Sequence, residues 1–267
     1  MKYKAGFIGC GNMGGALLGA AVRSIGAENC CVCEKHSEKI EKFLSAGVSS
    51  LDDKGVAANS KFVFLAVKPQ AMEKVASGIA GELSVNKDAI IVTMAAGMEI
   101  STLESFLGGE FPIIRIMPNT PCSLGKGVVL YCAGARVSAD DKAEFVSMFE
   151  NIGFLDEIDE EKIDAASVVS GCGPAFVYAF AEALANAASE CGLDKARAVL
   201  YAAKTLEGAA AMIEQSGKET DELIRNVCSP KGTTIEGIDS LRKNGFDTVV
   251  GDAVKASYRR TLELKGK

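Results

Sequence analysis

A glycine-rich segment near the start of the chain constrains the fold most strongly. Gly9-Cys10-Gly11-Asn12-Met13-Gly14 has the pattern G-x-G-x-x-G and directly follows a short apolar run, Ala5–Gly9. In this pattern the first glycine permits a tight strand-to-helix turn, the second lets the backbone approach a pyrophosphate, and the third lets helix and strand pack closely. The free N–H groups at the start of the following helix attract phosphate. The segment therefore predicts a dinucleotide site in a β-α-β unit, with an ordinary glycine-rich turn as the alternative.

Short apolar runs alternate with polar, helix-like stretches through the first half of the chain. The predicted strands are Ala5–Gly9, Cys30–Cys33, Phe62–Val67, Ala89–Met94, Pro112–Met117 and Gly127–Tyr131. Helices are predicted at Gly15–Ser24, Ser37–Ala46 and Ala71–Ile79. This alternation is typical of an α/β fold, and near-continuous apolar strands fit a doubly wound parallel sheet that is covered on both faces. We therefore expect a Rossmann-type dinucleotide-binding domain over residues 1–158.

The character of the sequence changes near Asp159, where the strand signals stop. The stretch Asp164–Ile213 is rich in alanine and has long amphipathic patterns that predict helices, and Gly171–Pro174 is expected to break or start one of them. We expect an all-α dimerisation and substrate domain over residues 159–267. Because a helical domain this rich in Ala, Val, Ile and Leu cannot easily cover its own apolar faces, a homo-oligomer is favoured over packing wholly onto the sheet domain.

Composition argues against several classes of protein. The chain has a net charge of −6, only 6% aromatic residues and no Trp, so it lacks the basic surface of a nucleic-acid-binding protein or of one attracted to an anionic membrane. Two uncharged runs, Ala5–Val22 and Ala165–Ala181, are interrupted by glycines and polar residues, and we interpret both as parts of a soluble protein. Nine cysteines in mostly apolar stretches predict reduced thiols and a cytoplasmic location, and with a single His no metal site is predicted.

Residues that follow the predicted strands are candidates for cofactor contacts. Glu34 follows the second strand, where an acidic residue commonly binds a ribose 2′-hydroxyl, whereas the adjoining Lys35 and His36 suit a 2′-phosphate. These signals leave the choice between NADH and NADPH open. Turns after other strands line the ligand crevice of such a sheet, with Lys68 and Asn119 as polar groups. These turns are Ala66-Val67-Lys68-Pro69, Ala95-Ala96-Gly97 and Met117-Pro118-Asn119-Thr120-Pro121.

A second candidate site lies near the carboxyl end of the chain. Ser229-Pro230-Lys231-Gly232-Thr233-Thr234 is a loop followed by a helical pattern that starts near Ile235. Clustered hydroxyls at a helix start suit a carboxylate, and a hydroxyl beside them could hydrogen-bond a neighbouring ring nitrogen. Thr233 and Glu236 also have the spacing of a capping box, so an ordinary capped helix is the alternative.

The sequence resembles the pyrroline-5-carboxylate reductase family along nearly its whole length. The segments that carry the resemblance are Phe7–Gly14, Ala66–Pro69, Ala95–Gly97, Arg115–Pro121, Ser170–Ala175 and Asn226–Ile235. The last segment is close to a family signature, whereas many reductases share the glycine loop. The resemblance implies that the chain reduces the C=N bond of L-1-pyrroline-5-carboxylate to L-proline with NADPH or NADH, the final step of proline biosynthesis.

That activity suits a chain with few acid–base residues. The only histidine, His36, is expected at the adenosine end of the cofactor, and the chain has no Tyr-x-x-x-Lys pair. An imine nitrogen is basic and takes its proton from solvent, so the protein mainly positions the ring against the nicotinamide. The resemblance implies that the catalytic hydroxyl near the imine nitrogen belongs to Thr234. It implies substrate contacts from Asn226, Ser229, Gly232, Thr233, Thr234 and, less specifically, Glu160.

The resemblance also implies a cofactor site and an assembly. Cofactor contacts are expected from Ile8, Gly9, Cys10, Gly11, Asn12, Met13, Gly14, Glu34, Lys35, Asp53, Ala66, Val67, Lys68, Pro69 and Ala96. Family members form dimers through interleaved helical domains, and some assemble into decamers. The active site is then expected between the sheet domain of one subunit and the helical domain of its partner.

Two residues depart from the family pattern. Lys231 stands where the family usually has a second Gly, so it is strained if the position needs a positive φ; alternatively, its ammonium attracts the substrate carboxylate. Asp53 stands where relatives can carry Asn near the adenosine ribose. Together with Glu34, the charge of Asp53 would disfavour a 2′-phosphate, which favours tolerance of NADH.

Two other functions fit parts of the sequence. A β-hydroxyacid-type dehydrogenase shares the glycine loop and a helical second domain, but it needs a catalytic Lys on the first long helix of that domain, and Asp164–Ser189 contains none. A non-catalytic dinucleotide sensor needs no carboxylate cradle, so the loop Ser229–Ile235 disfavours that function.

Overall fold

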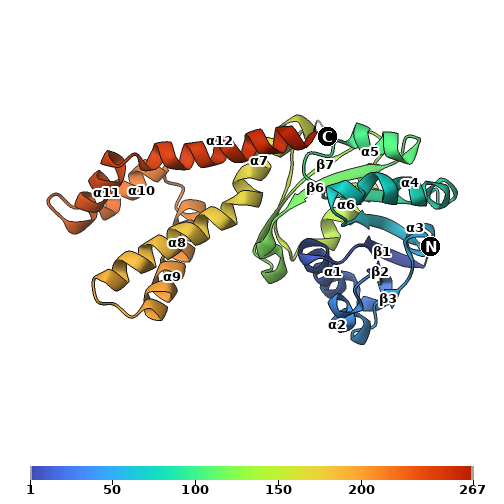
Figure 1. Ribbon diagram of the computed structural model, residues 1–267, viewed down its shortest axis with the longest axis horizontal. Coiled ribbons are helices and arrows are strands. Elements are labelled where there is room, and N and C mark those ends of the chain that lie inside the picture. Colours follow the sequence, from blue (N-terminus) through green and yellow to red (C-terminus); the bar gives the residue numbers. More distant parts are fainter. Residues whose placement is uncertain (1, 266–267) are drawn as a thin grey trace. The chain divides into compact units, whose positions relative to one another are not determined.

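The computed structural model describes residues 2–265 (Figure 1). Its strands are β1 (Tyr3–Ile8), β2 (Cys30–Cys33), β3 (Ser49–Ser50), β4 (Ser60–Leu65), β5 (Ile90–Thr93), β6 (Ile113–Pro118), β7 (Gly127–Ala133) and β8 (Gly153–Glu157). Its α-helices are α1 (Asn12–Ile25), α2 (Glu41–Ser45), α3 (Asp53–Asn59), α4 (Pro69–Val85), α5 (Ile100–Leu107), α6 (Ala139–Met148), α7 (Glu160–Ser167), α8 (Gly173–Glu190), α9 (Lys195–Gln215), α10 (Thr220–Val227), α11 (Thr233–Lys243) and α12 (Phe246–Lys265). Short helical turns are η1 (Ala27–Asn29), η2 (Ser37–Lys39), η3 (Thr120–Leu124) and the π-helical η4 (Val168–Cys172).

The strands of the described residues form one sheet in the order β3-β2-β1-β4-β5-β6-β7-β8. Strands β1 to β6 run parallel, which confirms the predicted doubly wound arrangement. β7 is antiparallel to β6, and β8 is parallel to β7. The sheet is therefore mostly parallel rather than wholly so. The reversal follows from chain length, because only η3 and a few flanking residues join β6 to β7, whereas a parallel return needs about a dozen residues or more.

Two strands and one helix differ from the sequence-based expectation. β3 is only two residues long, and β8, with the sequence Gly-Phe-Leu-Asp-Glu, is a largely exposed edge strand. Neither has the apolar run by which buried strands are predicted. The helix predicted at Ser37–Ala46 is instead the 3-10 turn η2 followed by the short helix α2.

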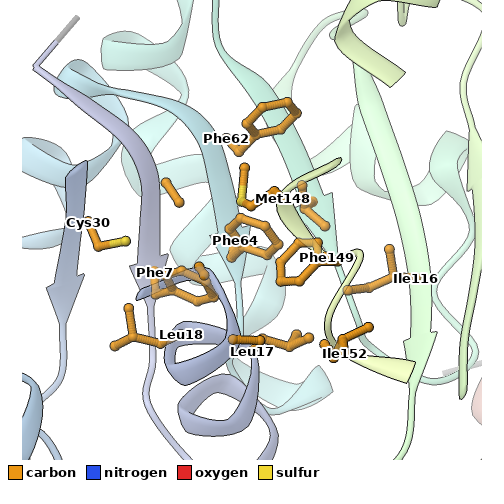
Figure 2. Close-up of a cluster of buried hydrophobic side chains, with 14 of the residues drawn as sticks. Phe7, Leu17, Leu18, Cys30, Phe62, Phe64, Ile116, Met148, Phe149 and Ile152 are labelled. Carbon is orange, nitrogen blue, oxygen red and sulfur yellow. The ribbon is translucent and has the colours of Figure 1, made fainter. Parts of the chain in front are cut away.

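The core of the sheet consists of two apolar layers, one on each face. On one face Phe7, Phe62 and Phe64 of the central strands pack against side chains of α1 and α6, and the rings of Phe7 and Phe64 stack with centroids 4.3 Å apart (Figure 2). On the other face, side chains of β4 and β5 pack against α3, α4 and α5. These layers hold the carboxyl ends of the parallel strands, where the cofactor residues are predicted, on a rigid frame.

The chain folds into two compact units. The first contains the sheet, continues to Cys172 and includes the end of α12 from Ser257; the second is Gly173–Ala256. Helix α7 belongs to the first unit because Ile163 is buried against the sheet residues Met117, Leu130 and Cys132. The expected domain limits of 1–158 and 159–267 therefore differ from the compact units.

The second unit exposes much of its apolar surface in a single copy of the chain. Its buried apolar residues include only the small side chains of Ala185, Ala198 and Ala202 among those described. Its exposed large apolar residues are Val177, Tyr178, Leu184, Val199, Leu200, Tyr201, Met212, Ile213, Val227, Leu241, Phe246, Val249 and Val250. One helical stretch of residues 2–265, Glu160–Glu190, is long and apolar enough to cross a membrane by length and composition alone, although η4 interrupts its regular α-helix.

Candidate functional site

The glycine loop joins β1 to α1 in the geometry that its sequence predicts. Gly9 has a φ of +96°, and a Cβ there would lie 2.5 Å from the carbonyl oxygen of Ala66. A Cβ at Gly14 would lie 2.8 Å from the Cβ of Ala66, whereas a Cβ at Gly11 would meet nothing within 4 Å. Because Gly11 is also the N-cap of α1, no side chain of that residue covers the first N–H groups of the helix. The loop thus fits the approach of a pyrophosphate to the backbone.

Glu34 is hydrogen-bonded to this loop. Its Oε2 accepts from the backbone N–H of Cys10 at 2.7 Å, and its Oε1 accepts from the N–H of His36 at 3.1 Å. Lys39 Nζ lies 3.9 Å from the same Oε1, and the Glu34 side chain is only 9% exposed. Burial favours the neutral acid, but these hydrogen bonds and Lys39 hold the pKa of Glu34 below its usual value. An ionised carboxylate therefore lies directly beside the loop.

Backbone hydrogen bonds bring together the ends of β1, β2 and β4. The N–H of Gly9 donates to the carbonyl of Cys33 at 2.8 Å, and the N–H of Ala66 donates to the carbonyl of Ile8 at 2.8 Å. Three segments that the sequence predicts to contact the cofactor, the glycine loop, the end of β2 and the turn after β4, are therefore adjacent.

The remaining predicted cofactor residues surround this group or follow the next strand. Lys35 is exposed after β2, and Asp53 opens α3. Lys68 is the N-cap of α4 and Pro69 its first residue. Ala96 is exposed on the loop after β5. All of these residues lie after a strand or at a helix start, and their contact with a cofactor stays a prediction.

Asn119, predicted as a polar group of the crevice, is used within the fold. Its side chain is 6% exposed, its Oδ1 accepts from the N–H of Val128 at 2.9 Å, and its Nδ2 donates to the carbonyl of Ser170 at 3.0 Å. These bonds fasten the segment after β6 to β7 and to η4.

A cleft of about 670 Å³ opens beside the glycine loop, and sequence analysis did not identify it. Its lining includes Gly11 and Asn12 together with three cations, Arg23, Lys39 and Lys42; among residues 2–265 no carboxylate lines it. The cations add positive charge beside a loop suited to phosphates. The spacing of Lys39 and Lys42, three residues apart in a predicted helix, was the available signal, because such residues share a helix face.

The second candidate site begins with a tight turn. The N–H of Gly232 donates to the carbonyl of Ser229 at 3.0 Å, which closes a four-residue turn with Pro230 and Lys231 at its centre. Lys231 has a φ of +60°, and among the described residues it is the one non-glycine residue with a positive φ. Pro followed by a left-handed residue is the pattern of a type II turn, which normally takes Gly at the second central position. The condition under which the sequence predicts strain at Lys231, a positive φ, is therefore fulfilled.

Helix α11 starts at Thr233 with Gly232 as its N-cap, and no side chain accepts a cap hydrogen bond there in the described structure. The capping-box alternative for Thr233 and Glu236 is therefore wrong, because Thr233 lies inside the helix rather than at the cap. Ser229, Thr233 and Thr234 are exposed around this uncapped helix start. The arrangement leaves N–H groups and hydroxyls available to a small anion.

The predicted substrate residues fall in both compact units. Asn226, in the last turn of α10, belongs to the second unit with the Ser229–Thr234 loop, and it is exposed. Glu160 belongs to the first unit. Its Oε1 accepts from the N–H of Ile100 at 2.8 Å and lies 3.4 Å from Arg115 Nη1, so this oxygen already caps α5.

Comparisons with known proteins match the chain over its whole length. A family model described as pyrroline-5-carboxylate reductase dimerisation matches residues 160–264, and one described as NADP oxidoreductase, coenzyme F420-dependent, matches residues 4–97. The chain is 38% identical to pyrroline-5-carboxylate reductase 3 of Danio rerio, over 100% of this chain and 93% of that protein. It is 36% identical to pyrroline-5-carboxylate reductase of Escherichia coli strain K12, over 99% of each.

A solved structure agrees with these sequence matches. The crystal structure of Plasmodium falciparum pyrroline carboxylate reductase with NADP bound superimposes with a TM-score of 0.90 at 31% identity, over 99% of each chain. The likeness therefore extends through both compact units and beyond the Rossmann fold that many reductases share.

Proposed function

The chain belongs to the pyrroline-5-carboxylate reductase family and is an NAD(P)H-dependent reductase of L-1-pyrroline-5-carboxylate to L-proline, and we propose that the Ser229–Thr234 loop binds its substrate. The observation that supports this proposal is the uncapped start of α11 beside the exposed hydroxyls of Ser229, Thr233 and Thr234. The substrate carries a carboxylate next to an imine ring, and a helix start with hydroxyls complements a carboxylate.

The chain's own residues have a modest chemical task in this reaction. When bound, the nicotinamide supplies the hydride that reduces the imine carbon. The N–H groups of Thr233 and Thr234, with the hydroxyl of Ser229, hold the carboxylate, whereas the predicted N–H donor Gly232 already donates to the carbonyl of Ser229. The Thr234 hydroxyl hydrogen-bonds the ring nitrogen, whose proton comes from solvent. Asn226 orients the ring from the neighbouring helix. Catalysis then rests on positioning rather than on a strong acid or base, which accords with a chain that has one His.

The cofactor residues are those of the glycine loop and its neighbours, and within this site we assign a preference for NADH. The Glu34 carboxylate is ionised and fixed by Cys10, so a 2′-phosphate on the adenosine ribose would be repelled. Asp53 adds a second carboxylate at the start of α3. The cations Arg23, Lys39 and Lys42 line the cleft beside the loop that takes the pyrophosphate. A kcat/KM that is higher with NADPH than with NADH would contradict this preference.

The protein is a homo-oligomer that acts on a small molecule, and the exposed apolar side chains of the second unit support a dimer formed through that unit. Some family members assemble such dimers into decamers. The molecular mass in solution distinguishes a dimer from a decamer of this chain. A cytoplasmic location is supported by the nine cysteines, which are all unpaired.

The function is tested by oxidation of NADH and NADPH in parallel with pyrroline-5-carboxylate, with proline measured as product. We expect Thr234→Ala to lower kcat by about 100-fold or more, the cost of removing one positioned hydrogen-bond donor at a reacting centre. The Kd for the cofactor should change by less than about twofold, because the described residues of the cofactor loop do not share partners with Thr234. Thr205→Ala, an exposed position within α9, is the matched control.

The outcomes separate the three candidate functions. Unchanged turnover in Thr234→Ala would remove this residue from the mechanism. Turnover of a β-hydroxyacid in place of the imine would favour the dehydrogenase, and cofactor binding without turnover of either would favour the sensor.

A further inference from the structure

The loop between β5 and α5 is a turn with Ala96 at its apex. The N–H of Met98 donates to the carbonyl of Ala95 at 3.2 Å, and Gly97 has a φ of +72°. Ala95 and Met98 are buried against the sheet, whereas Ala96 is exposed. The turn follows the carboxyl end of a parallel strand two positions from β1 in the sheet, which is the edge where ligands of such folds bind.

The last turn of α12 packs against the outer side of this loop. A Cβ added at Gly97 would lie 3.1 Å from Leu264 Cβ, 3.2 Å from the carbonyl carbon of Leu264 and 3.2 Å from Lys265 N. The approach is tight, and because Gly97 also has a positive φ, a larger residue would be strained at this position. Ala95 and Met98 thus contact the core and Gly97 contacts the end of α12, while Ala96 stays exposed.

Charged side chains join the same elements. Lys265 Nζ lies 2.8 Å from Glu99 Oε1, which is at the N-cap of α5, and 2.8 Å from Asp164 Oδ2 in α7. Arg115 of β6 donates to Asp164 Oδ1 and lies 3.4 Å from Glu160, which in turn accepts from Ile100 N–H. The side chains of Arg115 and Asp164 are 0% and 2% exposed.

Lys265 completes this network. Arg115 occupies one oxygen of the buried Asp164, and Lys265 is the cation that faces the other. Burial lowers the pKa of Lys265, but the carboxylates of Asp164 and Glu99 raise it more, so the ammonium is charged at neutral pH. Without it, the buried Asp164 would keep a carboxylate oxygen with no facing cation, which is costly because the group is desolvated. The half-exposed Glu99 would lose its contact with α12.

We propose that Lys265 is a positioning residue for the reductase. By pairing with both Glu99 and Asp164, it ties the β5–α5 loop to α7 and so holds Ala96 in place against the bound cofactor. This inference rests on the proposed function and goes beyond it, because it places a requirement for turnover at the end of α12. Small displacements of a positioning group reduce turnover by up to about 100-fold without loss of folding.

The test compares Lys265→Met, Lys265→Arg and the control Lys255→Met. Methionine keeps the apolar stem without the charge, and arginine restores the charge. Lys255 lies on the same helix and is exposed, 3.7 Å from Asp252. Amide hydrogen exchange of residues 95–100 is the first readout, with residues 9–14 of the glycine loop as an internal reference; steady-state kcat and KM are the second.

We expect exchange at residues 95–100 to rise about tenfold or more in Lys265→Met, because local opening follows the loss of the contacts that close it. Exchange at residues 9–14 should not change. Turnover should fall about tenfold while KM for pyrroline-5-carboxylate stays within about twofold, and Lys265→Arg should recover most of it. Lys255→Met should match the wild type in both readouts.

Wild-type exchange at residues 95–100 in Lys265→Met would overturn the inference, and so would an equal effect of Lys255→Met. Should Lys265→Met fail to fold, Glu99→Gln makes the same test from the exposed side, and wild-type exchange and kcat in that variant would also overturn it. If the wild type does not turn over pyrroline-5-carboxylate, the proposed function fails, but the exchange experiment still decides whether Lys265 holds the loop.

Discussion

Lys231 departs from the local rules of backbone conformation more than any other residue of the proposed site. A φ of +60° costs an L-amino acid about 1–2 kcal/mol relative to the right-handed region. Such strain persists where surrounding structure over-determines the backbone, and here the proline before it and the helix after it fix the turn. We propose that its ammonium attracts the carboxylate bound at the neighbouring loop, which a glycine could not do.

Lys231→Gly tests both consequences. We expect the free energy of unfolding to rise by about 0.5–1 kcal/mol, because relief of the strain exceeds the entropy that glycine adds to the unfolded chain. Turnover should persist, and KM for pyrroline-5-carboxylate should rise about threefold, as expected for loss of one exposed charge. Urea unfolding at fixed protein concentration and steady-state kinetics provide the measurements. An unchanged KM would show that the ammonium does not contact the carboxylate.

Glu34 gives a stability effect that depends on pH. The pKa of Glu34 lies below its usual value of 4.5, so its ionised form is stabilised in the folded protein. This contribution is fully present above pH 4.5 and disappears as the pH falls through the lowered folded-state pKa.

We therefore expect Glu34→Gln to be less stable than the wild type by about 1.5–3 kcal/mol at neutral pH, the value of a hydrogen bond to a charged group. The difference should shrink below pH 4.5 as the wild-type carboxyl is protonated. Thermal unfolding of both proteins at about three pH values per pH unit, between roughly pH 7 and pH 3, measures this difference in stability. A difference that stayed constant through that range would contradict the assignment of the charge.

At the scale of elements, the β1–loop–α1 unit shows how close packing supports the proposed cofactor site. Gly14 lies in the first turn of α1 and brings the helix against Ala66 after β4. The contact connects the glycine loop with the turn that carries Lys68 and Pro69. The absence of a side chain at Gly14 therefore permits both the close packing of α1 and the geometry of the proposed cofactor loop.

Gly14→Ala should destabilise the protein by about 1–3 kcal/mol, because the added methyl group would lie 2.8 Å from Ala66 Cβ and from the carbonyl oxygen of Gly9. NADH affinity should fall with it, as measured by fluorescence titration. Gly78→Ala in α4 is the control, since a Cβ there meets nothing within 4 Å and alanine favours the helix by about 1 kcal/mol. Equal effects of the two substitutions would refute the packing argument.

At the scale of the whole molecule, the second unit is the part that cannot be understood from one chain. Leu200 and Tyr201 of α9 are 55% and 54% exposed in a single copy, on the unit that matches the dimerisation family model. Apolar surface of this extent marks a protein–protein interface.

Leu200→Glu should therefore shift the protein toward the monomer, because a buried, unpaired carboxylate at an interface costs several kcal/mol, on the order of 2–5. Light scattering after gel filtration measures the mass. Val85→Glu is the control, since Val85 is 82% exposed at the end of α4 in the other unit. An unchanged mass for Leu200→Glu would place the interface elsewhere.

Local sequence signals predicted most of the fold and the family. All six predicted strands are present, the helical second half starts near Asp159 as expected, and the family resemblance is confirmed over the full chain. These predictions succeeded because buried parallel strands are apolar runs, a glycine loop needs particular residues, and both are local properties. The polar strands β3 and β8 carry no such local signal, since their pairing partners define them.

Tertiary structure alone decided how side chains far apart in the sequence are used. The Asn119 side chain hydrogen-bonds both β7 and η4, Glu160 caps α5, and Lys265 pairs with Glu99 from the end of α12. The sequence by itself determined which segments could bind a dinucleotide and a small carboxylate, because backbone turns and helix starts depend on near neighbours. It could not determine which charged groups are paired, because ion pairs and buried hydrogen bonds depend on distances that only the folded chain sets.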